Sequence, residues 1–362
     1  MKISFFFSSP RTFFKSLSQV SFFFLLIVIF EATVIISFES YVFGHFHDFP
    51  DLKSIYSNSL SVSLTLLLLS TVFLLYMTLE ALQTKNTVQV AALCCFHIDI
   101  FLISIIQISQ IYHIYSFALC KNNSEKADPM KFYISAFVHH YSKLNYILKL
   151  PSEVKPFFGS LPAIICVAGI ILSYLAYKIN RENGWIIYQK IGPDFRMRRR
   201  YMMYRVFITL IKFDFYFLLG TSIQYTMIIS EINTCELILT VLVIPLTIAV
   251  LMLALYGVIH ESRIAIYFSE FMFFLNIAYI LFKIIRMYLP AEIQRYTDSC
   301  REIVTAFSVL TLVSLLSTMI VGFSCCSNFY KGLRNYLIYL EKKKKQDAGS
   351  AYSPNSRMTL DD

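Results

Sequence analysis

The chain has 362 residues, of which 57% are hydrophobic and only 15% are charged, and its mean hydropathy is +0.60. A soluble domain of this length cannot bury so much apolar surface, so the composition excludes a soluble globular protein and predicts an integral membrane protein. The net charge is +9. Its basic residues cluster beside apolar segments, where anionic lipid attracts them, and this placement argues against nucleic acid as a partner.

Eight apolar segments are long enough to span a membrane, because about 20 helical residues cross about 30 Å of hydrocarbon. They are predicted at residues 20–38, 60–79, 90–119, 159–177, 206–229, 237–259, 264–289 and 303–323. Backbone groups in lipid must bond within their own segment, and the alternation of a membrane barrel is missing from the sequence. The predicted fold is therefore an all-α, polytopic transmembrane helix bundle over residues 1–326.

Charge in the connecting segments predicts the orientation of the bundle. The side that carries both termini holds 20 Lys and Arg residues, and the other side holds 10. Because cytoplasmic loops are enriched in these residues, both termini are predicted to be cytoplasmic. Residues 120–158 would then be lumenal, where the sequence Asn122-Asn123-Ser124 makes Asn122 a glycosylation candidate.

The segment after the last span is expected to stay at the cytoplasmic surface. Apolar residues recur at helical spacing among basic ones, which predicts a basic interfacial helix over 327–345. Residues 346–362 are rich in Ser, Pro and Asp and are predicted to be a disordered cytoplasmic tail. Cys325 and Cys326, beside this helix, are palmitoylation candidates, with buried or idle thiols as the common alternative.

A basic connection joins the fourth and fifth predicted spans. It carries Trp185, the single Trp of the chain, and four arginines close together. These are Arg196, Arg198, Arg199 and Arg200. We expect this loop to contact anionic membrane lipid on the cytoplasmic side, or a cytosolic protein partner.

Ionisable residues inside the predicted spans are the best functional lead, because a charge in hydrocarbon costs at least about 2.5–3.5 kcal/mol. By their positions in the spans, four of them are expected at one level near the cytoplasmic surface. They are Asp99, Lys212, Asp214 and Glu270. Glu31 is expected to lie alone near the middle of the first span.

This polar layer has two interpretations. It is either a cavity for a lipid headgroup, a proton or an ion, with Lys212 as counter-charge to the three acids, or a set of interhelical pairs that position the helices. The structural interpretation is favoured, because paired structural charges perturb membrane helices without doing chemistry. A metal site of Cys94, His97 and Asp99 is not expected, because by helical angle His97 points away from Asp99.

The sequence contains no nucleophile motif, phosphate-binding glycine loop, zinc-protease helix or dinucleotide fingerprint. No catalytic residue, cofactor or metal is therefore predicted. The leading expectation is a non-enzymatic membrane role, in lipid or solute handling or in scaffolding of membrane traffic. The alternatives are a receptor-like polytopic protein and a lipid-modifying membrane enzyme that uses Asp99, Asp214 or Glu270.

Several short patterns carry a resemblance to a known family. They are Glu182 with Gly184-Trp185, Tyr188 followed by Ile191-Gly192 and Asp194, Lys212-Phe213-Asp214-Phe215 leading to Gly220 and Gln224, Arg286 with Tyr288-Leu289, and Asn328-Phe329 with Gly332-Leu333. The chain resembles a fungal family of multi-pass Golgi apparatus membrane proteins without an assigned activity. Asn183 and Pro193 depart from the pattern of this family, so the chain resembles a divergent member of it. The resemblance implies residence in the Golgi or a related endomembrane, and it transfers no catalytic residue.

Overall fold

The computed structural model of the chain describes residues 17–47, 50–124, 155–191, 195–229, 234–288 and 301–331. The regular elements in these ranges are all α-helices, and eight of them are long and apolar enough to cross a membrane. They are α2 (Gln19–His47), α3 (Pro50–Thr84), α4 (Thr87–Ser124), α7 (Lys155–Ile191), α8 (Phe195–Ile229), α9 (Thr234–Ile259), α10 (Arg263–Tyr288) and α12 (Arg301–Cys326). The all-α, eight-helix prediction is confirmed. The orientation of the termini stays a prediction.

Most helices extend well beyond the apolar runs that predicted them. Helix α3 has 35 residues and begins at Pro50, ten residues before the predicted start at position 60. Helix α7 continues to Ile191 and α8 begins at Phe195. Hydropathy marks only the part of a helix that lies in lipid, whereas backbone hydrogen bonding continues past that boundary. The prediction that the four arginines lie in a loop is therefore wrong, because they belong to the first turns of α8.

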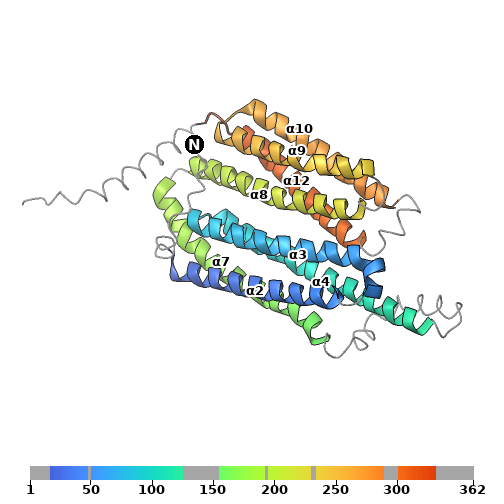
Figure 1. The fold of residues 1–362 in the computed structure, drawn as a ribbon. Helices are drawn as coiled ribbons and strands as arrows, with labels where there is room; N and C mark the ends of the chain where they lie inside the picture. Colours follow the sequence, from blue (N-terminus) through green and yellow to red (C-terminus); the bar gives the residue numbers. More distant parts are fainter. Residues whose placement is uncertain are drawn as a thin grey trace, which may run out of the picture.

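The eight helices form two rings of four, each made of consecutive elements (Figure 1). In the first ring α2 packs on α3, α3 on α4, α4 on α7, and α7 again on α2. In the second ring α8, α9, α10 and α12 close in the same way. Each ring has its own hydrophobic core, and residues of α8 and α12 also join the core of the first ring.

Helix α8 connects the two rings, because it packs on α9 and α12 and also on α3 and α4. Gly220 permits this close approach, since a Cβ atom there would lie 2.7 Å from the Phe307 ring and 3.2 Å from Leu66. Tyr216 of the same helix stacks on Phe73, and their ring centroids are 4.8 Å apart. The contact between the rings is thus built mainly from aromatic side chains around one glycine.

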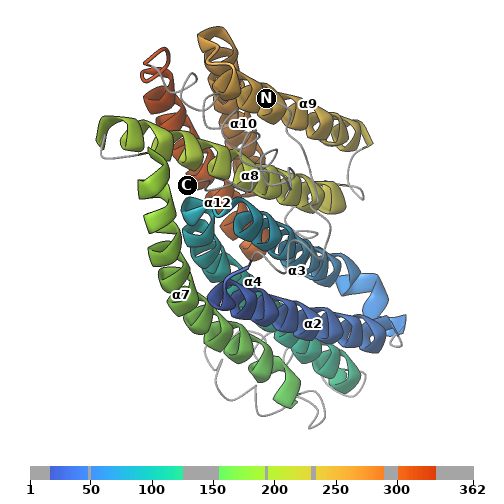
Figure 2. The ribbon, with the colours of Figure 1, turned by 90° about the vertical axis from the view of Figure 1, so that its left-hand side faces the viewer.

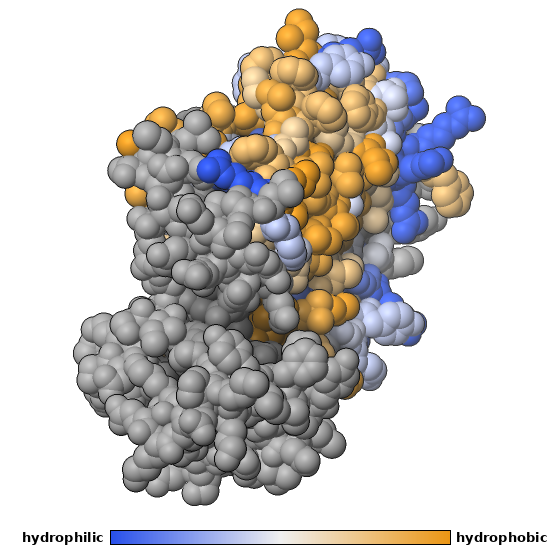
Figure 3. Space-filling model, turned by 90° about the vertical axis from the view of Figure 1, so that its right-hand side faces the viewer, coloured by the Kyte–Doolittle hydropathy of each residue, from blue (hydrophilic) through white to orange (hydrophobic). Residues whose placement is uncertain are grey.

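The outside of the bundle is apolar. Large hydrophobic side chains are exposed along the spans, for example Ile170 on α7, Leu242 on α9 and Ile320 on α12. Hydrophobic residues form a broad band over the described part of the face seen in Figure 3. A lipid environment removes the cost of exposing these side chains, so the surface agrees with the membrane spans.

The ends of several helices meet at one end of the bundle, which we call the basic end. Here α8 and α10 begin and α9 and α12 finish (Figure 2). Arg200 Nη1 donates to the Lys331 carbonyl oxygen at 2.7 Å, and the Tyr330 N–H donates to Glu261 Oε2 at 3.1 Å. The Arg263 guanidinium lies 5.2 Å from the centre of the Tyr330 ring.

These contacts bear on the predicted interfacial helix. Residues 327–330 form turns rather than a helix, and Tyr330 has a positive φ of 61°. The prediction that a helix begins at residue 327 is therefore wrong. Residues 332–345 and the predicted tail over 346–362 lie outside the described residues.

Candidate functional site

Buried acidic side chains lie in the interior of both rings. Five of them, from four helices, are no more than 5% exposed. They are Glu31, Glu39, Asp99, Asp214 and Glu270. A carboxylate in such surroundings needs a hydrogen-bond donor, a counter-charge or a proton, because transfer of an isolated charge out of water is costly. The partner of each acid therefore indicates what it does.

Two acids of α2 have partners from α4 in the interior of the first ring. Glu31 Oε2 lies 2.8 Å from His97 Nε2, and both side chains are buried. Gln107 Nε2 donates to both carboxylate oxygens of Glu39 at 3.0 Å. The expectation that Glu31 lies alone is wrong, because His97, which points away from Asp99, points instead toward α2. Both pairs read as structural contacts that fix α2 against α4.

Lys212 does not serve as counter-charge to the three predicted acids. Its Nζ atom lies 2.5 Å from Glu80 Oε1, and Gln89 Nε2 donates to the other oxygen of Glu80 at 3.2 Å. The side chains of Lys212 and Glu80 are 22% and 26% exposed. Residues two apart on a helix point about 200° apart, so Lys212 and Asp214 face different neighbours. The predicted layer is therefore divided between the two rings.

Asp99 lies where the rings meet. The Tyr216 hydroxyl of α8 is 3.4 Å from Asp99 Oδ2 and 2.6 Å from the Ser70 hydroxyl of α3. All three side chains are buried. This group joins three helices and supports the structural interpretation for Asp99.

Asp214 points from α8 into the second ring, where α12 supplies its donors. The Ser314 hydroxyl donates to Oδ1 and the Thr318 hydroxyl donates to Oδ2, each at 2.5 Å. Ser314 and Thr318 are one helical turn apart, so the same face of α12 presents both hydroxyls. Asp214 is fully buried, and each of its oxygens accepts one hydrogen bond.

Glu270 of α10 has no such support. It is 3% exposed, and neither of its carboxylate oxygens has a hydrogen-bond partner among the described residues. It lies within electrostatic range of Asp214. Gly322 of α12 makes room for its carboxylate, since a Cβ atom on Gly322 would lie 1.9 Å from Glu270 Oε1. We call Asp214 and Glu270 the acid pair.

The acid pair is suited to bind a proton or a small cation. Two ionised carboxylates near each other repel strongly in a medium of low dielectric constant, and a proton or a cation removes that repulsion. Asp214 receives two donors that stabilise its ionised form, whereas Glu270 receives none from the described part of the chain. The described residues contain no group of three or more His, Cys, Asp or Glu side chains that could hold a metal ion.

Further polar contacts continue from the acid pair along α8 and α12, and we call them the polar seam. Thr221 and Thr311 are joined by a hydrogen bond of 2.8 Å, and Tyr225 and Ser308 by one of 3.1 Å. Tyr225 is also within electrostatic range of Tyr279 on α10. At about 1.5 Å per residue, the seam extends roughly 16 Å from Asp214 to Tyr225. It leads away from the basic end, because α8 begins there.

The structure also places the other predicted sites, which are the four arginines, Asn122 and the two cysteines. Arg196, Arg198 and Arg199 are exposed at the start of α8, and Arg200 is partly buried against the segment after α12. The backbone of Asn122 is in the last turn of α4, and its side chain lies outside the described residues.

The two palmitoylation candidates are buried. Cys325 and Cys326 are each 4% exposed among the residues where α12 ends. Palmitoylation stays a prediction, and acylation of either thiol would require this end of α12 to open.

Sequence reasoning missed Glu39 and Glu80, and it missed Tyr216 as a partner of Asp99. The predicted spans end at residues 38 and 79, one residue before each glutamate, because a charged residue marks the end of an apolar run. The helical positions could have revealed Glu39, because it is eight residues after Glu31 and therefore lies on the same face of the helix. Only the packing of α8 against α3 and α4 reveals the role of Tyr216.

Comparison with known proteins shows that the chain has a fungal relative. The chain is 41% identical over 330 residues to a UPF0658 Golgi apparatus membrane protein of Schizosaccharomyces pombe, and the match covers 91% of this chain and 93% of the relative. No family model matches the chain. No solved structure matches it either.

Proposed function

The chain belongs to the UPF0658 family of Golgi apparatus membrane proteins, and from that premise we propose that the solute it handles is the proton, which it binds and releases at the acid pair. It is a multi-pass protein of the Golgi apparatus membrane. In this proposal the second ring carries the function and the first ring supports it.

One observation carries the proposal: Glu270 is buried without a hydrogen-bond partner among the described residues, and it lies within electrostatic range of a second carboxylate. A purely structural acid is expected to have a donor or a counter-charge, as Glu31, Glu39 and Glu80 do. A buried polar group that lacks one is costly, so its retention points to a ligand. The smallest ligand that satisfies a carboxylate pair is a proton.

The polar seam supports the proposal because it supplies groups beyond the acid pair. The side chains of Thr221, Thr311, Tyr225 and Ser308 can each donate and accept a hydrogen bond. They join α8 to α12 between the acid pair and the end opposite the basic end. Ordinary interhelical hydrogen bonds would use the same residue types, so the seam supports the proposal only together with Glu270.

Reconstitution tests the proposal directly. The purified full chain is placed in liposomes that enclose a pH-sensitive dye, and a pH difference is applied together with a membrane potential. We expect proton entry with the wild-type protein. Glu270→Gln and Asp214→Asn should each lower the rate by about tenfold or more, because loss of one interaction of about 1.5–3 kcal/mol changes an equilibrium by that factor.

A matched control separates function from folding. Glu39→Gln neutralises an equally buried carboxylate in the first ring, and its rate should stay near that of the wild type. Each variant is first checked for a single symmetric peak in size-exclusion chromatography. Wild-type protein that lets no protons enter, or acid-pair variants as active as Glu39→Gln, would reject the proposal in favour of a scaffold or receptor role.

The basic end supports a second, separate part of the proposal, which concerns partners. Arg198 and Arg199 are exposed at the start of α8, beside the exposed apolar side chain of Phe195. Basic residues next to an exposed aromatic ring favour an anionic lipid surface. Replacing both arginines by Gln should reduce cosedimentation of the detergent-purified chain with phosphatidylserine vesicles, and equal binding to neutral vesicles would contradict this assignment.

A further inference from the structure

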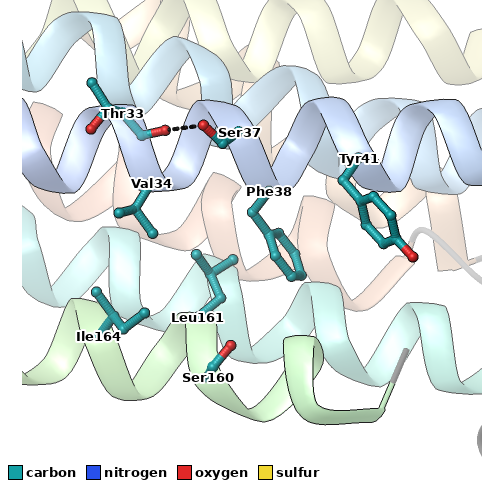
Figure 4. Close-up of a pocket in the computed structure, with 8 residues that line it drawn as sticks. All are labelled: Thr33, Val34, Ser37, Phe38, Tyr41, Ser160, Leu161 and Ile164. Atoms are coloured by element: carbon teal, nitrogen blue, oxygen red, sulfur yellow. Dashed lines mark hydrogen bonds between the residues drawn. The ribbon is translucent and has the colours of Figure 1, made fainter. Parts of the chain in front are cut away.

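A groove lies between α2 and α7 in the first ring, remote from the acid pair. Its volume is about 410 Å³. Figure 4 shows its lining, in which Val34 and Phe38 of α2 face Leu161 and Ile164 of α7. Thr33, Ser37, Tyr41 and Ser160 complete the lining. The groove belongs to the membrane-spanning parts of both helices, which cover residues 19–44 and 160–184.

Two of the polar side chains in this groove, Thr33 and Ser37, already have hydrogen-bond acceptors. The Thr33 hydroxyl donates to the Phe30 carbonyl oxygen, and the Ser37 hydroxyl donates to the Thr33 carbonyl oxygen, each at 2.7 Å. Both hydroxyls therefore bond to the backbone of α2 itself and place few demands on a ligand. The part of the groove near Val34 and Ile164 offers apolar contacts.

The surroundings of the groove identify what fills it. The outward faces of α2 and α7 next to it are strongly apolar, with Phe30 61% exposed and Val167 57% exposed. Water is unstable in an apolar groove inside hydrocarbon, and an empty groove would lose dispersion contacts along its whole lining. A hydrocarbon chain satisfies both conditions.

We propose that this groove is a binding site for one acyl chain of a membrane phospholipid. The acyl chain lies along α2, and its methyl end is near Val34 and Ile164. Its glycerol ester lies near Tyr41 and Ser160, which are close to the limits of the two spans at the end opposite the basic end. Tyrosine is favoured at this depth, because its ring is apolar and its hydroxyl reaches the headgroup region.

Photo-crosslinking in nanodiscs tests the site. The full chain is incorporated into phosphatidylcholine nanodiscs that contain a phosphatidylcholine with a diazirine on one acyl chain, and crosslinked peptides are located by mass spectrometry. We expect crosslinks to concentrate on residues 33–41 and 160–164. Ile164→Trp should lower them by about tenfold, because an indole fills the groove.

A control on the same helix makes the result specific. Ile170 is 67% exposed on α7 and is not part of the groove lining, so Ile170→Trp should leave the crosslinks at 33–41 unchanged. Val34→Trp fills the groove from the α2 side and should repeat the effect of Ile164→Trp. Crosslinks spread evenly around the bundle, or equal loss with Ile170→Trp, would show that only ordinary surrounding lipid is present and would overturn the site.

Discussion

At the scale of single residues, the acid pair depends on a glycine. Gly322 lies where α12 passes Glu270, and a Cβ atom there would come within 1.9 Å of Oε1 and 3.0 Å of the Phe207 ring. The carboxylate therefore occupies space that only glycine leaves open. By contrast, a Cβ atom on Gly44 of α2 would have nothing within 4 Å.

Gly322→Ala should therefore move the Glu270 side chain without changing any charge. We expect a loss of stability of about 1–3 kcal/mol, which is typical of overpacking, together with proton entry reduced as in Glu270→Gln. Thermal unfolding and the liposome assay measure the two effects, with Gly44→Ala as the control. The double variant Gly322→Ala/Glu270→Asp, with its shorter acid, should recover stability. A Gly322→Ala protein like the wild type in both assays would contradict the placement of Glu270.

At the scale of elements, α2 and α4 are tied together by polar side chains in the interior of the first ring. The Glu31–His97 pair is almost fully buried, and Gly169 of α7 packs beside it, since a Cβ atom on Gly169 would lie 3.3 Å from the His97 ring. Because both partners are buried, loss of either side chain should lower the stability of the protein. It also fixes how far α2 can slide along α4.

His97→Leu should destabilise the protein by about 3–5 kcal/mol, because it leaves the Glu31 carboxylate buried without its partner. The double variant Glu31→Leu/His97→Leu should recover much of this loss, since no buried charge remains. Unfolding followed by circular dichroism in mild detergent with increasing denaturing detergent measures the difference. If the effects of the two single variants simply add in the double variant, the contact does not hold α2 to α4.

At the scale of the whole molecule, the number of spans decides whether the two termini lie on the same side of the membrane. The described residues contain eight candidate spans, and an even number predicts that both termini lie on one side of the membrane. The charge distribution predicts that this side is cytoplasmic. A tag after Asp362 should therefore be digested by protease added to intact Golgi vesicles. Residues 120–158 are predicted to be lumenal and Asn122 is a glycosylation candidate, so Asn122→Gln tests for a glycan at this position. A protected C-terminal tag would contradict the orientation.

The sequence by itself determined the membrane class, the helical fold and the number of spans, because these depend on hydrophobicity averaged over about 20 residues. It also found four buried acids, Glu31, Asp99, Asp214 and Glu270, since a charge within an apolar run is visible without any packing. Only the tertiary structure decided their partners. Lys212 joins Glu80 of the other ring and His97 joins Glu31, whereas Glu270 has no donor within the described ranges. Such contacts join residues between 66 and 132 positions apart, and no periodicity within one helix encodes which neighbour it will meet.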